Sequence, residues 1–386
     1  MISLVYRSTL ALPDSVLQPL SDLYHDATSG DLFGVTYDGA QLLRFENGTN
    51  TGDAYVVSNG LTVQGTGARL QGWYAESPLL AVGGHDFDDP AVFRLAGSGP
   101  VATSAFDFPA AALLDAEPGQ AVTDREGRTY LIAADGDTVS SRLVESDGSQ
   151  TPVDVDGVAD NLWVQTPGVV KTVTQNQRSY ALVASSGSNS ITVMEVMGSG
   201  KLFATDHVFD DQRTRFAGVK SLEVLTLGDT VFVAAAGSDD GVSVFRLLPG
   251  GKLQHLSSMA DAVGRALNNV SSLSLSVSGN ALHVHASSET DAGVALLTAD
   301  LSGLGEVITG SVAGETLVGT NKDDVLVGGA GSDVLSGGAG ADILRDGTGE
   351  DVLTGGAGAD IFQLVMDGSV DLITDFDVSM DSLDLS

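Results

Sequence analysis

Short alternating runs of apolar and polar residues dominate residues 1 to about 305, and no long segment there has apolar residues at helical spacing. Six runs share one form: an apolar strand, a small turn rich in Asp, Gly and Ser, and a second strand. Their starts lie 47 to 51 residues apart, at Leu32, Leu79, Tyr130, Tyr180, Val231 and Leu282. The stretches between runs are long enough for two more strands, so each repeat predicts four strands.

Four strands in every 40 to 50 residues are typical of a β-propeller. An array of β-sandwiches is the alternative, but each sandwich needs about 100 residues. A seventh unit, built from residues 2–8 and residues near Glu306, would close the ring. The runs from Tyr180 and Val231 resemble those of YVTN-type and lactonase-like propellers, the second being followed by PGGKL at residues 249–253. We therefore expect an all-β chain in which residues 1–305 form a propeller of six or seven blades.

A nine-residue period replaces this pattern near the C-terminus. Four consecutive units over residues 328–363 read GGAGSDVLS, GGAGADILR, DGTGEDVLT and GGAGADIFQ. Each has Asp at its sixth position and an apolar residue at its eighth. A flexible Gly/Asp linker is the alternative, but such a linker does not require this regular spacing. Two earlier units are weaker, since the unit at 310–318 has Glu315 in the Asp position and the unit at 319–327 has Lys322 in place of a glycine.

Repeats of this kind predict a parallel β-roll over residues 306–366, followed by a flanking segment at 367–386. A strand after each Asp would point its middle residue inward, and two units would make one flattened coil. Units two apart would then stack on one edge of the roll. We expect one edge to hold Glu315, Asp333 and Asp351, and the other to hold Asp324, Asp342 and Asp360, with Asp360 near the end of its stack.

The turns of these units have the composition of a cation site. Glycine lets the backbone adopt positive φ and point its carbonyls at a common centre, and each Asp adds a carboxylate. Carboxylate and carbonyl oxygens suit a hard cation, whereas an EF-hand would need a Glu at position twelve and flanking helices. The residues expected to form the sites are Asp324, Asp333, Asp342, Asp351, Asp360, Gly328, Gly329, Gly331, Gly337, Gly338, Gly340, Gly347, Gly349, Gly355, Gly356 and Gly358.

The segment resembles the calcium-binding repeats of the repeats-in-toxin (RTX) family. The resemblance implies that the cations are several calcium ions held between successive turns, and that the protein is secreted by type I secretion machinery through an uncleaved C-terminal signal. The tail from Val370 to Ser386 resembles the segment that follows RTX repeats, with matches at Asp371, Asp375, Phe376, Asp381 and Asp384. More chain usually follows in relatives, so we expect an unusually short signal or a truncated chain.

Charge and composition limit the classes of partner that the protein can bind. The net charge is −33, of which residues 310–386, with 15 acidic and two basic side chains, contribute −13. Both parts of the chain repel nucleic acid and anionic membranes, so we expect neither nucleic-acid binding nor membrane insertion. The first residues show no signal peptide, and no stretch has the length of a transmembrane helix. The lack of cysteine excludes disulfides and thiolate chemistry.

Catalytic residues are not evident in the sequence. His283 and His285 alternate on one strand face and offer two ligands to a transition metal, although packing is the alternative. His85, Asp86, Asp88 and Asp89 form either a cation site or a solvated acidic loop. The sequence contains no HExxH and no GxSxG motif.

We therefore predict a secreted, extracellular calcium-binding protein whose roll folds on binding calcium and whose propeller is a binding or adhesion platform for an unknown ligand. The alternative is an extracellular hydrolase or lactonase with its active site in the propeller channel. A buried metal or an acid–histidine cluster in the channel would favour the enzyme, and a channel lined by Ser, Ala and Val would favour the platform.

Overall fold

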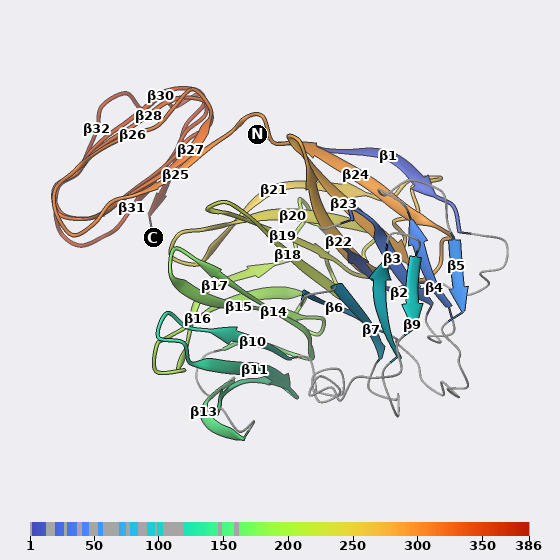
Figure 1. Cartoon of the computed structure of the whole chain (residues 1–386). Coiled ribbons are helices and arrows are strands. Elements are labelled where there is room, and N and C mark those ends of the chain that lie inside the picture. Colours follow the sequence, from blue (N-terminus) through green and yellow to red (C-terminus); the bar gives the residue numbers. More distant parts are fainter. Residues whose placement is uncertain are drawn as a thin grey trace.

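A computed structural model of the chain describes residues 2–12, 20–26, 29–36, 41–45, 53–56, 69–74, 78–83, 91–96, 99–102, 119–145, 149–157 and 162–385. All regular structure among these residues is β-strand. The strands form two bodies, a set of antiparallel sheets that uses most of the chain and a two-sheeted roll at the C-terminal end (Figure 1).

Six four-stranded antiparallel sheets form the larger body within the described residues. The first two contain β2 (Leu20–His25), β3 (Leu32–Thr36), β4 (Gln41–Phe45) and β5 (Asp53–Val56), then β6 (Arg69–Tyr74), β7 (Pro78–Gly83), β8 (Ala91–Ala96) and β9 (Gly99–Ala102). The next two contain β10 (Gly119–Thr123), β11 (Thr129–Asp135), β12 (Thr138–Val144) and β13 (Gln150–Gly157), then β14 (Pro167–Gln175), β15 (Arg178–Ser185), β16 (Ser190–Val196) and β17 (Leu202–Phe209). The fifth contains β18 (Ser221–Leu227), β19 (Thr230–Ala236), β20 (Gly241–Leu248) and β21 (Lys252–Ala260). The sixth contains β22 (Val270–Ser278), β23 (Ala281–Ser288), β24 (Val294–Asp300) and β1 (Leu4–Leu10).

The six hairpins expected from the sequence are confirmed as the second and third strands of these sheets. The runs that begin at Leu32, Tyr130 and Val231, for example, are the pairs β3–β4, β11–β12 and β19–β20. The stretches between the hairpins supply the first and fourth strands, as the spacing predicted. A local pattern could reveal these hairpins because each pairs strands that are neighbours in the sequence.

The sixth sheet is completed by the opposite end of the chain. Strand β1 pairs with β24, with Leu4 opposite Ala299 and Leu10 opposite Val294. The expected seventh sheet from residues 2–8 and residues near Glu306 is therefore wrong. The free edge of β24 takes β1 as its partner, and β25 (Leu304–Thr309), which contains Glu306, pairs with the roll instead.

The apolar cores of this body lie between successive sheets. One core packs Phe232 and Val244 of the fifth sheet against Leu273 and Val284 of the sixth, and Ile2 and Leu4 also enter it. Similar cores join the fourth and fifth sheets, the third and fourth, and the sixth and first. The first strands of neighbouring sheets also pack together, with β14 between β10 and β18. The sheets pack face against face, with their first strands at the centre. This arrangement is a β-propeller, with six blades in the described residues.

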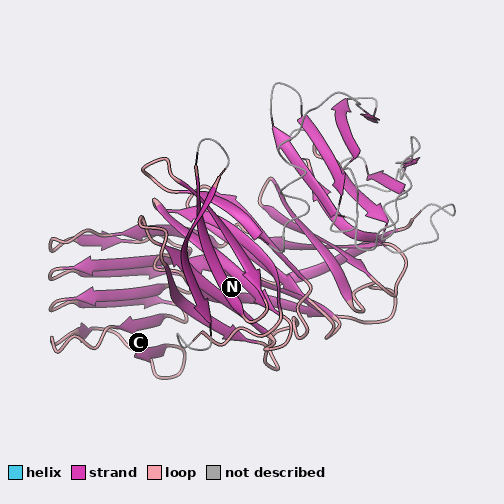
Figure 2. Cartoon of the chain, turned by 90° about the horizontal axis from the view of Figure 1, so that it is seen from below, coloured by secondary structure: helices cyan, strands magenta, loops and turns pink. Residues whose placement is uncertain are grey.

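The roll consists of two parallel sheets that face each other. One contains β25, β27 (Asp323–Ala330), β29 (Ile343–Thr348), β31 (Ile361–Leu364) and β33 (Ser382–Leu385), and the other contains β26 (Thr316–Val318), β28 (Val334–Ala339), β30 (Val352–Ala357) and β32 (Leu372–Ile373). Paired residues in the repeats are 18 apart, as in Val325 with Ile343 and Val334 with Val352. The coils are stacked in parallel layers beside the propeller (Figure 2).

The eighth position of each repeat forms the core of the roll, as expected. Its residues are fully buried between the two sheets: Leu326, Leu335, Leu344, Leu353 and Phe362. The strands extend beyond the residues directly after each Asp, since β28 and β30 continue into the glycine turns. The tail adds β32 and β33 to the two sheets, and the ring of Phe376 lies 5.8 Å from that of Phe362.

Candidate calcium-binding ladders

Two stacks of carboxylates run along the turns of the roll, and we call them the ladders. The first ladder consists of Asp324, Asp342, Asp360 and Asp381, and the second of Glu315, Asp333, Asp351 and Asp371. In each ladder the backbone N–H of one residue donates to Oδ1 of the next. The N–H groups of Asp324 and Asp342 are 2.8 and 2.9 Å from their acceptors on Asp342 and Asp360.

The expected division of the acidic residues between two edges is what the structure shows. Both ladders extend further than expected, because Asp351 donates to Asp371 at 3.1 Å and Asp360 donates to Asp381 at 2.9 Å. Asp360 is therefore the last but one residue of its ladder and, unlike a residue at the end of a stack, has a ladder neighbour on each side. The tail residues are 20 and 21 positions on rather than 18, so the strict period of the repeats did not reveal them.

Four ladder residues have a buried oxygen with no hydrogen-bond donor. These atoms are the Oδ2 oxygens of Asp333, Asp342, Asp351 and Asp360, whose residues are at most 1% exposed. A buried charged oxygen without a donor or a cation is strongly destabilising. Calcium prefers carboxylate and carbonyl oxygens in loop geometry, so the donor set of these turns fits this ion.

Glycine at the first position of a repeat keeps the space beside Oδ2 open. A Cβ on Gly328 would lie 2.7 Å from Oδ2 of Asp333, which no real contact tolerates. Gly329, next in the turn, has a φ of 104°, which L side chains rarely adopt. The same positive φ occurs at the other turn glycines expected in the sites, namely Gly331, Gly338, Gly340, Gly347, Gly349, Gly356 and Gly358. Gly337 and Gly355 repeat the position of Gly328, beside Asp342 and Asp360.

Asp324 differs from the other four aspartates of the predicted sites. Thr320 occupies the second position of its repeat, and its N–H and hydroxyl donate to Oδ2 of Asp324 at 2.5 and 2.9 Å. Ser311 does the same for Glu315, at 2.7 Å from its N–H and 2.6 Å from its hydroxyl, and these bonds lower the pKa of Glu315. A Ser or Thr at position two thus satisfies the carboxylate of its own repeat. The sequence contains this signal, but it lies outside the Asp period.

Burial and stacking both disfavour the ionised form of the ladder carboxylates. Burial raises the pKa of Asp342 to about 6, and the nearby carboxylates of Asp360, Asp324 and Asp323 raise it as well. The pKa values of Asp351 and Asp360 are raised by burial in the same way. A cation between the coils would reverse this penalty, because an opposite charge nearby favours the ionised carboxylate.

Asp346 is a buried carboxylate of the roll that was not among the ligands predicted from the sequence. Asp346 occupies the first position of the third repeat, where the other three consensus repeats have glycine, and it is fully buried. Ligand oxygens of Asp346, Asp351 and Asp371 all lie within 4.8 Å of one another. Burial raises the pKa of Asp346 to about 6, with further contributions from Asp371 and Asp351. In the sequence, this carboxylate is indicated by the letters DGTG, which replace GGAG at the start of the third consensus repeat.

A family model named RTX calcium-binding nonapeptide repeat (4 copies) matches residues 309–344 and 336–363. Residues 309–363 carry RTX calcium-binding repeats. Such repeats are typical of secreted proteins. None of the described residues forms a helix long and apolar enough to cross a membrane. Among curated proteins, none matches this chain.

Several solved structures are similar to the propeller at low sequence identity. A protein from Lactobacillus plantarum is 14% identical, with 73% of this chain and 84% of that one covered at a TM-score of 0.38. A proposed 6-phosphogluconolactonase from Bacteroides uniformis is also 14% identical, with 71% and 79% covered at a TM-score of 0.39. The PQQ-bound aldose sugar dehydrogenase of Streptomyces coelicolor is 12% identical, with 78% and 99% covered at a TM-score of 0.45.

His283 and His285 both lie on β23 of the propeller. The rings of His283 and His285 lie 6.4 Å apart on β23, and His285 is 2% exposed. Burial lowers the pKa of His285 to about 3, so the ring is neutral. Among the described residues, the cluster of Asp346, Asp351 and Asp371 is the group with three close ligand side chains, so the two histidines gain no third ligand there. His85, Asp86, Asp88 and Asp89 lie outside the described residues.

Polar side chains on the first strands of the blades bond to one another across the blades. Lys171 of β14 forms a salt bridge of 2.7 Å with Glu223 of β18. The hydroxyl of Ser272 on β22 donates to Asp22 on β2 at 2.8 Å. These contacts tie neighbouring blades together.

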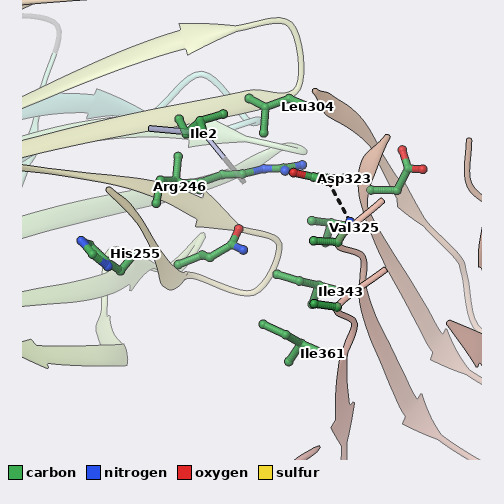
Figure 3. Close-up of a pocket in the computed structure, with 13 residues that line it drawn as sticks. Ile2, Arg246, His255, Leu304, Asp323, Val325, Ile343 and Ile361 are labelled. Carbon is green, nitrogen blue, oxygen red and sulfur yellow. Dashed lines mark hydrogen bonds between the residues drawn. The ribbon is translucent and has the colours of Figure 1, made fainter. Parts of the chain in front are cut away.

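A pocket is lined by residues of both the propeller and the RTX roll (Figure 3). On its roll side Val325 and Ile343 are each 2% exposed and form a small apolar cluster with Leu248 of β20. Arg246, also on β20, is 2% exposed, and its guanidinium points toward Asp323 (Figure 3). Burial lowers the pKa of Arg246 to about 10, and the carboxylates of Asp324 and Asp323 oppose this shift. The propeller thus supplies a positive charge beside the first rung of the first ladder.

Replacing Arg246 with Met should affect the two bodies differently. The Nε and Nη2 atoms of Arg246 are buried without partners, so an apolar side chain of similar length should not lower the free energy of unfolding of the propeller. The calcium midpoint for folding of the roll should rise about fivefold, equivalent to roughly 1 kcal/mol. Circular dichroism measures the calcium midpoint of the roll in a calcium titration and the free energy of unfolding of the propeller in a denaturant titration. A fall in propeller stability with an unchanged calcium midpoint would contradict this role.

Proposed function

We propose that this protein is secreted and that its RTX roll folds on binding several extracellular calcium ions, with the propeller as a binding or adhesion platform. One observation carries the proposal, the four buried Oδ2 oxygens on Asp333, Asp342, Asp351 and Asp360 that have no donor. Together with the turn carbonyls next to the paired glycines, these oxygens would hold calcium between coils. The ion would supply positive charge between carboxylates that otherwise repel one another.

Each part of the chain has a definite task in this proposal. The glycine turns orient the carbonyls, the Asp side chains neutralise the ion, and the buried eighth positions hold the coils together. Asp324 is a further proposed ligand, although Thr320 already satisfies its carboxylate. Extracellular calcium modules of this ligand type bind with dissociation constants of about 10⁻⁴–10⁻³ M. A roll with such an affinity stays unfolded where calcium is scarce and folds outside the cell.

Calorimetric titration of the full chain with calcium tests this function. We expect uptake of several ions at millimolar calcium. Changing Asp333, Asp342, Asp351 and Asp360 to Asn should abolish most of the heat. The matched control changes four exposed acids, Glu306, Glu350, Asp377 and Asp384, to their amides, which removes the same charge and should preserve binding. Equal loss in both quadruple variants would show that net charge, not the ladders, attracts calcium.

Export can be tested separately from calcium binding. With type I secretion machinery present in the host, we expect the full chain to accumulate in the medium in folded form. A chain that contains only the propeller, residues 1–303, should remain in the cells. Equal export of both chains would show that residues 304–386 are not required for secretion.

The polar contacts between the first strands of the blades support a platform. Lys171, Glu223, Asp22 and Ser272 serve one another as partners and brace the blades, which is the role of structural rather than reacting groups. Blades that are tied together in this way would hold a binding surface in place.

A further inference from the structure

The third consensus repeat departs from the other three at its first position. Asp346 stands where the others have Gly328, Gly337 and Gly355. Its side chain is fully buried within β29, and its ligand oxygens lie within 4.8 Å of those of Asp351 and Asp371. Three carboxylates therefore converge at one position of the second ladder. Among the described residues, this is the one group of three acidic side chains whose ligand atoms lie so close together.

Oδ2 of Asp351, at the same position, has no hydrogen-bond donor. Asp351 is 1% exposed; its Oδ1 accepts the N–H of Asp333 at 2.7 Å, while its Oδ2 has no donor. A buried oxygen without a partner, next to two further carboxylates, is strongly unfavourable unless a cation neutralises the group.

We propose that Asp346 is an additional side-chain ligand of the calcium ion between Asp351 and Asp371, so that this position binds calcium more tightly than the others and fills first. The inference rests on the proposed calcium binding by the ladders. Its physical basis is that the number of charged ligands is a main determinant of calcium affinity in protein loops. The roll would then begin to fold at its C-terminal coils, where Asp371 joins the tail to the repeats.

Asp346 also has a structural contact that the test must separate from ligation. The N–H of Val365 donates to its Oδ1 at 2.9 Å and to its Oδ2 at 3.2 Å, which fixes the irregular turn after β31. The N–H of Gly347 also donates to Oδ1. A carboxylate has about four acceptor sites, so these bonds leave room for an ion. Asn at position 346 retains a carbonyl oxygen for Val365 but loses the charge, whereas Gly restores the consensus repeat and loses both.

The experiment is a titration of the full chain with calcium by calorimetry, and with terbium by luminescence. The native chain should show one site at least about tenfold tighter than the rest. Asp346→Asn and Asp346→Gly should both merge this site with the weaker class. Glu350→Gln, which removes a charge from an exposed residue of the same repeat, should keep the tight site.

The outcomes distinguish this inference from the proposed function beneath it. Absence of any calcium uptake by the native chain would overturn both. Uptake of several ions with one uniform affinity, unchanged in Asp346→Asn, would leave calcium binding intact and overturn the role of Asp346. Loss of the tight site in Asp346→Gly but not in Asp346→Asn would also overturn it, because only the contact with Val365 would then matter.

Discussion

Chelation of calcium should unfold residues 310–386 and leave the propeller folded. The roll has a net charge of −13 over this segment and 15 glycines, and its inner core consists of one side chain per repeat. Low hydrophobicity with high net charge favours disorder. Calcium binds only the folded roll, so it stabilises that state by mass action, and its removal reverses the effect. The propeller has cores of its own between its blades.

Hydrogen exchange with and without EDTA measures this result along the chain. Protection should vanish over β26 to β33 and persist over β14 to β24. Leu248 would lose its cover by Val325 and Ile343, so the propeller should lose at most about 2 kcal/mol of its free energy of unfolding. Circular dichroism should retain most of the β signal. Collapse of the whole signal in EDTA would show that the two bodies do not fold independently.

The second large effect is a difference between two buried aspartates of the first ladder. Asp342→Asn should raise the calcium midpoint for folding about tenfold, or roughly 1.4 kcal/mol, whereas Asp324→Asn should raise it by about twofold or less. Both residues are fully buried in the same ladder, and Asn retains the oxygen that accepts the ladder hydrogen bond. They differ because Oδ2 of Asp342 has no donor, while Thr320 donates twice to Oδ2 of Asp324.

Exchange-detected calcium titration of the two variants provides the comparison. Asp360→Asn is the second test, since Asp360 also has an unsatisfied Oδ2 and lies between Asp342 and Asp381. We expect it to match Asp342→Asn, not to be weaker as a residue at the end of a stack would be. Equal midpoints for Asp342→Asn and Asp324→Asn would mean that an unsatisfied oxygen does not identify a ligand.

The sequence predicted those features that repeat locally. Alternating apolar residues and Asp/Gly turns predicted the hairpins, because strands adjacent in the chain pair through short turns. The nine-residue period predicted both the inward side chains, such as Leu344, and the pairing of residues 18 apart. The positions of Asp333, Asp342, Asp351 and Asp360 on two edges followed from the same period.

Contacts between distant or irregular segments did not follow from any period. The pairing of β1 with β24 joins the two ends of the propeller, and only the free edge of β24 in the folded blade makes it possible. Asp371 and Asp381 extend the ladders although the tail is out of step with the repeats.

The sequence by itself therefore determined an all-β chain with a propeller and an RTX roll, since strand pattern and repeat length are local properties. Tertiary structure alone decided which charges from other coils and from the propeller lie beside each carboxylate. Arg246 of the propeller lies near Asp324, and Asp346 lies beside Asp351 and Asp371 of neighbouring coils. The affinity of each calcium position depends on such neighbours, because burial and nearby charge set the free energy of a carboxylate.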